Sequence, residues 1–99
     1  MTSSITMRDF YQLANHKELE IIDVRESYEY QTGHVPHAKN LPLSSLSSSM
    51  TELDDSKDYY LICQSGARSE NACVFLAGQS YNVINVLGGT AAWPGELVR

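Results

Sequence analysis

The sequence has few cysteines, and this limits what can hold the fold together. Two cysteines in 99 residues are too few for a disulfide scaffold, and no Cys-x-x-Cys pair points to a metal site. Free thiols persist in a reducing environment, so the expected location is the cytoplasm. The first residues, 1–6, show no basic region followed by an apolar core, and we therefore expect no secretory signal.

The sequence also lacks long apolar runs and clusters of positive charge. No run of 18 apolar residues occurs, so we expect no membrane-spanning helix. Only seven lysines and arginines are present, scattered along the chain, and the formal net charge is −5. These features argue against nucleic acid and against an anionic membrane as partners. An anion site in this protein would have to be built locally, against the overall charge.

What is present is the composition of one ordinary globular domain spanning residues 1–99, with 42% hydrophobic and 19% charged residues. Residue patterns predict strands near Ile5 and at 19–24, 39–41, 59–62 and 82–87, with helices at 7–17, 27–31, 70–79 and 90–93. Segment 43–58 is rich in serine and is open to two interpretations, a weak amphipathic helix or a solvated surface segment. The alternation of strands and helices predicts an α/β fold with a mainly parallel sheet flanked by helices on both faces.

Cys63 directly follows the predicted strand 59–62, and a short loop containing Gly66 leads into the next helix, with Ser69 as the expected N-cap. Ligands of such folds bind beyond the carboxyl ends of the strands. Backbone N–H groups of the loop and first helical turn would converge there, and Arg68 adds a full positive charge. A thiol in that field ionises below its reference pKa of about 8.5. The alternative is a buried structural cysteine.

The spacing between cysteine and arginine bears on the chemistry of this loop. A thiolate cradled by N–H groups can attack phosphorus, sulfur or a disulfide. Cysteine-based phosphatases place five residues between the two, whereas four separate Cys63 from Arg68. The shorter loop forms a smaller bowl, which suits a single sulfur atom better than a tetrahedral phosphate. The spacing thus counts against a phosphatase or arsenate reductase.

The loop and three other segments resemble the single-domain rhodaneses, the thiosulfate sulfurtransferases. The four segments are LICQSGARS at 61–69, IIDVR at 21–25, GHVPHAKNLP at 33–42, and LGG at 87–89 followed by Trp93. They occur in the family's order and span the chain from about Ile5 to about Pro94. One departure is His37, where the family most often has glycine.

The resemblance implies a five-stranded sheet and a ping-pong reaction through Cys63. The cysteine would take sulfane sulfur from thiosulfate or a persulfide, become a persulfide, and pass the sulfur to cyanide or a thiol. It implies no cofactor and no metal. A second hypothesis keeps the fold but makes the chain a sulfur-carrier or interaction module that exchanges sulfur with a protein partner.

Individual residues then receive expected roles. The donor-binding loop comprises Gln64, Ser65, Gly66, Ala67, Arg68 and Ser69, mainly through its backbone amides. Arg68 either binds an anionic donor and lowers the thiol pKa, or pairs with a carboxylate such as Glu70. Asp23 and Arg25 are expected to support the site as an ion pair rather than to take part in catalysis.

Three further residues attract attention without an expected catalytic role. Gly66 is expected to adopt the positive φ that the loop requires. His34 is expected to be a hydrogen-bonded structural residue, because it follows the end of helix 27–31, which Gly33 is expected to close in the left-handed conformation. Cys73 could resolve an oxidised Cys63, but its apolar surroundings favour a place in the core.

Overall fold

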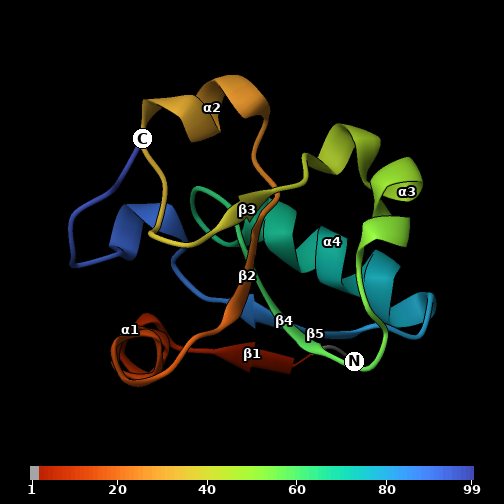
Figure 1. Cartoon of the computed structure of the whole chain (residues 1–99), viewed down its shortest axis with the longest axis horizontal. Helices are drawn as coiled ribbons and strands as arrows, with labels where there is room; N and C mark the ends of the chain where they lie inside the picture. The colour runs from red at the N-terminus through yellow and green to blue at the C-terminus, as the bar shows by residue number, and fades with distance from the viewer. Residues whose placement is uncertain (1–2) are drawn as a thin grey trace.

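Five parallel strands form the centre of the computed structural model, which describes residues 3–99 (Figure 1). The strands are β1 Ser3–Ile5, β2 Glu20–Asp23, β3 Lys39–Asn40, β4 Asp58–Ile62 and β5 Asn82–Val86. The helices are α1 Met7–His16, α2 Ser27–Thr32, α3 Leu46–Ser49 and α4 Ala67–Gly78, with 3-10 turns η1 Leu43–Ser45, η2 Met50–Glu52 and η3 Thr90–Ala92. The prediction of an α/β fold with a five-stranded parallel sheet is confirmed.

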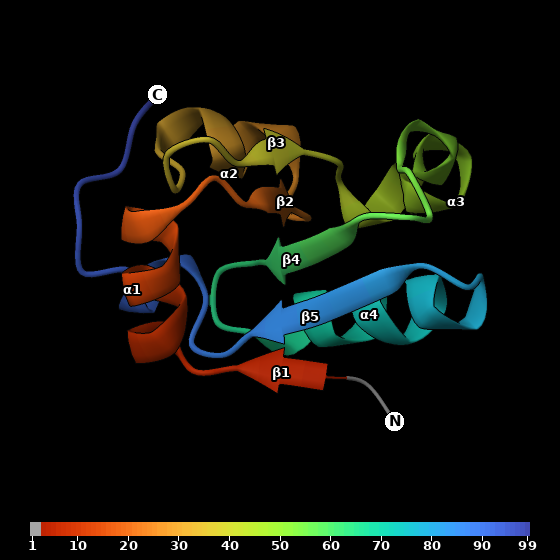
Figure 2. The ribbon, with the colours of Figure 1, turned by 60° about the horizontal axis from the view of Figure 1, so that its bottom comes forward.

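The strand order, β1-β5-β4-β2-β3, places β4 at the centre of the sheet. Figure 2 shows β1, β5 and β4 side by side. Asp23 at the end of β2 pairs in register with Ile62 at the end of β4. The residues that follow these two strands therefore emerge next to each other, at the sheet edge where parallel α/β folds bind their ligands.

Helices cover both faces of the sheet, and each face has its own core. Leu46 of α3 and Leu76 of α4 pack with Leu61 of β4 on one face. On the other face Phe10 of α1 packs with Ile62 of β4. Because neighbouring side chains of a strand point to opposite faces, one strand supplies residues to both cores.

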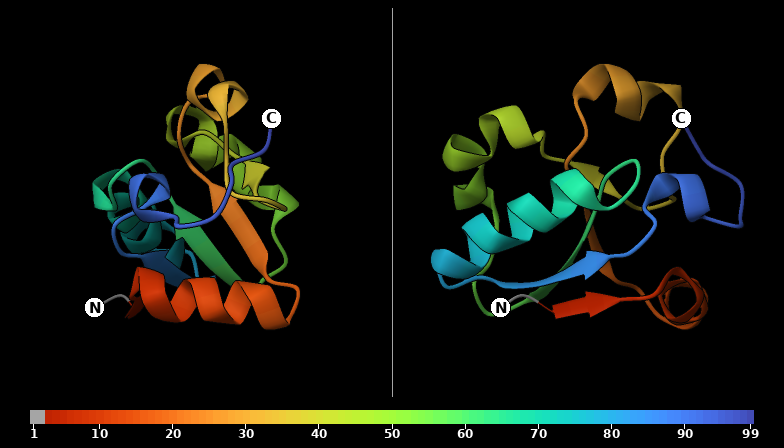
Figure 3. Two further views of the ribbon diagram at one scale, coloured as in Figure 1. Left: turned by 90° about the vertical axis from the view of Figure 1, so that its left-hand side faces the viewer. Right: turned by 180° about the vertical axis from the view of Figure 1, so that it is seen from behind.

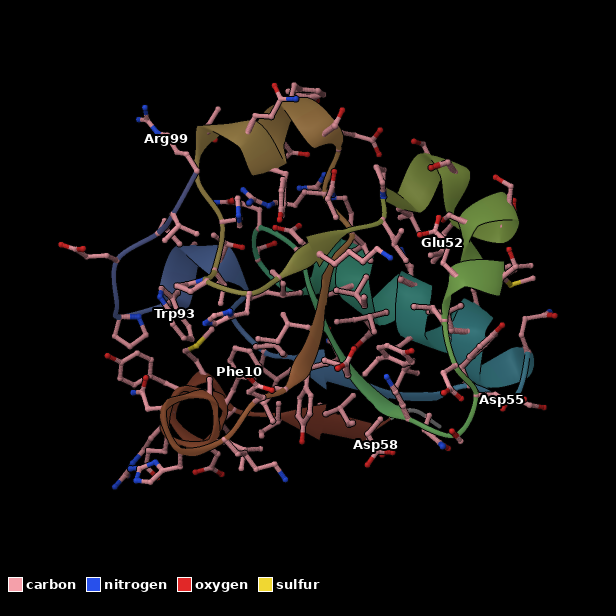
Figure 4. All side chains as sticks on the ribbon, in the orientation of Figure 1. Phe10, Glu52, Asp55, Asp58, Trp93 and Arg99 are labelled. Carbon is pink, nitrogen blue, oxygen red and sulfur yellow. The ribbon has the colours of Figure 1, made fainter. Side chains whose placement is uncertain are left out.

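Aromatic rings extend the core under α1. Phe10 and Trp93 lie edge to face with ring centroids 5.8 Å apart (Figure 4). A second edge-to-face contact of 4.9 Å joins Trp93 to Tyr11. These rings attach η3, which follows β5, to the helix near the start of the chain.

Segment 43–58 follows the helical interpretation more closely than the solvated one. It folds as three successive short turns, η1, α3 and η2, rather than as one helix. Leu46 and Leu53 are buried in the core, and Met50 packs against it half-buried. The regularly spaced apolar side chains of this segment thus reach the core although its backbone does not form one continuous helix.

Two expectations about helix ends were wrong. Helix α4 begins at Ala67, and its N-cap is Gly66 rather than Ser69, with φ 107° and ψ −13°. The positive φ expected of Gly66 is confirmed. Gly33 ends α2 with φ 147° and ψ 136°, whereas a glycine that directly follows a helix of the predicted kind was expected in the left-handed helical region. The extended exit lets the next residue, His34, form paired backbone hydrogen bonds of 2.8 and 2.9 Å with Val98.

Among residues 3–99, no helix is both long enough and apolar enough to cross a membrane.

Candidate active site

Cys63 lies one residue beyond β4, where the chain curls into α4 (Figure 3). Its side chain is only 1% exposed, and the cysteine is a free thiol. Of the loop residues expected to bind a donor, Gln64, Ser65 and Ala67 are exposed, Gly66 and Arg68 are half-buried, and Ser69 is buried. The loop thus places the sulfur at the floor of a curl whose rim is accessible.

Two donors point at the sulfur atom of Cys63. The Gly66 N–H donates to Sγ at 3.0 Å, and the Ser69 hydroxyl oxygen lies 3.3 Å from Sγ. Burial raises the pKa of Cys63, but hydrogen bonds from the Ser69 hydroxyl and from the N–H groups of Ser69, Gly66 and Ser65 outweigh burial. The pKa therefore lies below the ordinary value of a cysteine, and the loop favours the thiolate.

Ser69 and Asn85 form a buried polar pair beneath the loop. The hydroxyl oxygen of Ser69 lies 2.5 Å from Asn85 Oδ1, and Asn85 Nδ2 donates to the Gly66 carbonyl at 3.2 Å. Asn85 was missed in the sequence, although a polar residue within the apolar strand 82–87 was an available signal. A buried amide needs partners, and here the loop provides them.

The segment after β5 holds the loop from outside. Thr90 N–H donates to the Cys63 carbonyl at 2.8 Å, and Ala91 N–H donates to the Gln64 carbonyl at 3.0 Å. This close approach requires glycine at position 89, because a Cβ on Gly89 would lie 2.5 Å from the Cys63 carbonyl oxygen. The Gly-Gly pair noted in the sequence therefore lets two backbones touch.

Asp23 and Arg25 form a buried ion pair beside the loop. Arg25 Nη2 lies 2.9 Å from Asp23 Oδ2, and its Nε donates to both carboxylate oxygens at 3.1 Å. Arg25 also donates to the Gly33 carbonyl at 2.8 Å and to Gln64 Oε1 at 3.3 Å. The pair therefore connects the end of β2 and the end of α2 to the loop that contains Cys63.

Arg68 forms an ion pair with Glu29 of α2 rather than with Glu70. Two hydrogen bonds of 2.6 and 2.9 Å join the guanidinium to the carboxylate. The bond from Arg68 holds the pKa of Glu29 at about 2, so this carboxylate is ionised throughout the physiological range. The positive charge expected to serve the thiolate is already paired, which leaves the loop N–H groups and Ser69 as the main donors to Cys63.

The other two residues discussed from the sequence lie where they were expected. Cys73 is fully buried in the core between the sheet and α4, where burial raises its pKa to about 12. His34 stacks on Tyr30 with ring centroids 3.6 Å apart, and its Nδ1 lies 2.9 Å from the Tyr30 carbonyl oxygen. The burial of Cys73 and the stacking and hydrogen bond of His34 fit the structural roles expected for these two residues.

Comparison with known proteins gives the class to which this fold and loop belong. Residues 6–96 match the rhodanese-like domain family. A crystal structure of a rhodanese-related protein from Thermoplasma volcanium superposes with a TM-score of 0.88 at 31% identity, covering 97% of each chain. The chain therefore belongs to the rhodanese-like domain family.

Three relatives of this chain have names that refer to transferring or carrying sulfur. YtwF of Bacillus subtilis, named as a candidate sulfurtransferase, is 42% identical over 80 residues, which are 81% of this chain and 78% of the relative. A protein of Allochromatium vinosum named sulfurtransferase is 36% identical over 83% of this chain and 78% of its own. YrkF of Bacillus subtilis, named as a candidate sulfur carrier, is 37% identical over 93% of this chain but only 51% of its own length.

Proposed function

We propose that the protein is a sulfurtransferase that carries sulfane sulfur as a persulfide on Cys63. The observation that carries the proposal is the pair of donors on Sγ, the Gly66 N–H at 3.0 Å and the Ser69 hydroxyl at 3.3 Å, at the carboxyl end of a central parallel strand. These donors stabilise the thiolate, which is the nucleophilic form of cysteine. Relatives named for sulfur transfer support the same chemistry.

The reaction divides into two transfers that balance without a redox partner. The Cys63 thiolate attacks the outer sulfur of thiosulfate, a sulfur–sulfur bond forms, and sulfite leaves with the electron pair of the broken bond. A persulfide donor reacts in the same way and leaves as its thiolate. Cyanide or an acceptor thiolate then attacks the outer sulfur of Cys63 persulfide and restores the Cys63 thiolate. No metal or cofactor enters either step.

The charge at the rim of the loop bears on the choice of donor. Arg68 is the only basic residue of loop 63–69, and Glu29 neutralises it through two hydrogen bonds. A dianion such as thiosulfate then depends on backbone N–H groups for binding. A persulfide needs less compensation of charge, so both donors remain within the proposal and the experiment compares them.

A second candidate function is that of a sulfur carrier, in which Cys63 receives sulfur from a protein partner and passes it to another protein. The observation that favours it is the 37% identity to YrkF over 93% of this chain. Both functions use the same persulfide and differ in the donor and acceptor. A free thiol is needed in either case, so the cytoplasm stays the expected location.

The test is to incubate the reduced protein with thiosulfate and separately with glutathione persulfide, and to measure the intact mass. We expect the gain of one sulfur atom at Cys63 and its removal by cyanide with formation of thiocyanate. Cys63→Ser should gain no sulfur while its circular dichroism and melting temperature match those of the native protein.

The outcomes separate the candidates. Loading from a small donor with repeated turnover supports the enzyme. Loading only from a protein donor, such as a cysteine desulfurase, supports the carrier. A mass that stays unchanged with every donor contradicts both, and hydrolysis of a phosphate ester well above background would contradict the argument from loop size.

A further inference from the structure

The hydroxyl group of Ser69 has more acceptors than it can serve. Its oxygen lies 3.3 Å from Cys63 Sγ, 3.2 Å from the Gly66 carbonyl oxygen and 2.5 Å from Asn85 Oδ1. A hydroxyl has a single proton and donates one full hydrogen bond at a time. The shortest contact is the one to Asn85, which makes Asn85 the competitor of Cys63 for this proton.

The Asn85 side chain is fixed in the orientation that makes it an acceptor for Ser69. Its Nδ2 donates to the Gly66 carbonyl at 3.2 Å, so Oδ1 faces the Ser69 hydroxyl. Exchanging the two ends of the amide would set two acceptor oxygens against each other at Gly66. Asn85 is 2% exposed and Ser69 fully buried, which removes both from the solvent that could otherwise satisfy them.

The direction of the Ser69 proton then depends on the charge state of Cys63. When Cys63 is a thiol, S–H donates to Ser69 Oγ, the Ser69 hydroxyl donates to Asn85 Oδ1, and every donor has an acceptor. When Cys63 has lost its proton to a base in solution, Sγ is the stronger acceptor and the hydroxyl rotates toward it. The Ser69 proton stays on Oγ throughout, and only its direction changes.

We propose that Asn85 is a positioning residue that holds the Ser69 hydroxyl away from Cys63 whenever Sγ is not an anion and releases it to the thiolate. The persulfide half of the cycle rests on the function proposed above. After sulfur transfer the negative charge lies on the outer sulfur, Sγ becomes a weak acceptor, and the hydroxyl returns to Asn85. Asn85 therefore stabilises the thiol and the loaded persulfide relative to the free thiolate.

Charged groups around the loop do not change in the variants that test this idea. Arg68 of α4 is paired with Glu29 of α2, and Arg25 beyond β2 is paired with Asp23. Asn85 is neutral, and replacing it with leucine or alanine leaves both pairs in place. A change in the ionisation of Cys63 can then be traced to hydrogen bonding.

The first experiment measures the rate of Cys63 alkylation by iodoacetamide against pH, with the modified residue located by peptide mass. In Asn85→Leu the Ser69 hydroxyl loses its nearest acceptor, and only the Gly66 carbonyl at 3.2 Å still competes with Sγ for its proton. Because Sγ is the stronger acceptor once it is ionised, the pKa of Cys63 should fall, by up to about one unit for one typical hydrogen bond. Ser69→Ala should raise it by a similar amount. The double variant should behave like Ser69→Ala. Asn82→Ala, at an exposed position of the same strand, is the matched control and should leave the profile unchanged.

A second experiment needs no substitution of Asn85 and therefore does not depend on whether such a variant folds. In the native protein the NMR signals of the Asn85 side-chain amide should titrate together with Cys63, because the hydroxyl leaves Oδ1 as the thiolate forms. In Ser69→Ala this titration should largely disappear. The side-chain amide of Asn82 provides the internal control.

Two results would overturn the proposal. One is a rise in the pKa of Cys63 in a folded Asn85→Leu variant, which would make Asn85 a support of the loop alone. The other is an Asn85 amide that titrates equally in the native protein and in Ser69→Ala. Alkylation does not require sulfur transfer, so a protein that shows the expected profiles but accepts no sulfur would contradict the proposed function and the persulfide half of this inference, and would leave its thiol–thiolate half standing.

Discussion

The two cysteines occupy the same core but differ in ionisation. Cys63 is 1% exposed and Cys73 0%, and both belong to the cluster between the sheet and α4. Burial raises the pKa of Cys73 to about 12, with the nearby negative charge of Glu70 adding to the effect. Burial also raises the pKa of Cys63, but hydrogen-bond donors of the loop and of Ser69 reverse the outcome.

The comparison separates exposure from reactivity. A buried thiol inside a helix meets no free backbone donors, because the helix uses its own N–H groups. A buried thiol just before a helix meets several free backbone N–H groups, because the first N–H groups of a helix have no partner within it. The opposite pKa shifts of the two cysteines, which lie ten residues apart in the sequence, therefore follow from a difference in backbone geometry.

The largest effect is expected when each cysteine is replaced by serine and sulfur loading from a donor is measured. Cys63→Ser should reduce loading to background, since no nucleophile remains. Cys73→Ser should keep most of the loading, because the Cys73 thiol is buried in the core and its raised pKa keeps it protonated. Intact mass after incubation with donor measures both. If Cys73→Ser lost all loading in a folded protein, the core role assigned to Cys73 would be wrong.

Alkaline pH should destabilise the fold through Cys73. Its pKa is raised from the unfolded reference, so above about 8.5 the unfolded chain releases a proton that the folded chain retains until about pH 12. The free energy of unfolding should fall by about 1.4 kcal/mol per pH unit in that window. Denaturant unfolding at several alkaline pH values measures the slope.

Cys73→Ala provides the control for the alkaline slope, because it removes this titrating group and should reduce the slope, while other groups with a raised pKa, such as Tyr30, still titrate. The effect of Cys63 on the pH dependence of stability has the opposite sign. Its lowered pKa adds stability that is present above the unfolded pKa and is lost as pH falls through the folded pKa. If the free energy of unfolding fell equally steeply with pH in the native protein and in Cys73→Ala, the burial of Cys73 would not contribute to the pH dependence of stability.

Gly66→Ala tests whether loop geometry makes Cys63 reactive. The φ of 107° strains any residue with a Cβ, and we expect a loss of about 1–2 kcal/mol in stability. A Cβ there would meet its nearest neighbour, the Gly88 nitrogen, at 3.4 Å, so the cost lies in the backbone rather than in a clash. As the Gly66 N–H turns from Sγ, the pKa of Cys63 should rise. Denaturation and alkylation profiles measure the two effects, and unchanged alkylation would show that this N–H is dispensable.

The smallest effect is expected at Arg68. Arg68→Lys keeps the charge but loses the two-bond contact to Glu29, which at this half-exposed site is worth about 1 kcal/mol or less. The pKa of Cys63 should change less than in Ser69→Ala, because backbone and hydroxyl donors dominate. If the pKa of Cys63 changed more in Arg68→Lys than in Ser69→Ala, Arg68 would be the main group that stabilises the thiolate.

Much of the fold could be predicted from the sequence, and so could the place of Cys63 at the centre of the candidate site. Strands and helices followed from apolar periodicity, and Cys63 at a strand end followed from their order. The start of α4 was misplaced because serine is a common N-cap, whereas Ser69 turns its hydroxyl toward Cys63 and Asn85. A local preference was overridden by a contact that forms only in the folded chain.

Long-range partners were the part that the sequence could not supply. The ion pair between Arg68 and Glu29 spans 39 residues, and Glu70 was nearer in the chain. Asn85 lies 16 residues from Ser69, on a different element. Such pairs depend on how the helices pack against the sheet and against each other. The residue pattern within one segment does not determine this packing.

The hydrogen bonds from η3 to the loop also determine the electrostatic potential around the sulfur. In a planar trans peptide the C=O and the following N–H point in opposite directions. Fixing the carbonyls of Cys63 and Gln64 outward on Thr90 and Ala91 therefore turns the N–H groups of Gln64 and Ser65 inward. The segment that follows β5 thus influences the surroundings of the Cys63 sulfur from a distance, by orienting the dipoles of peptide groups that belong to another part of the chain.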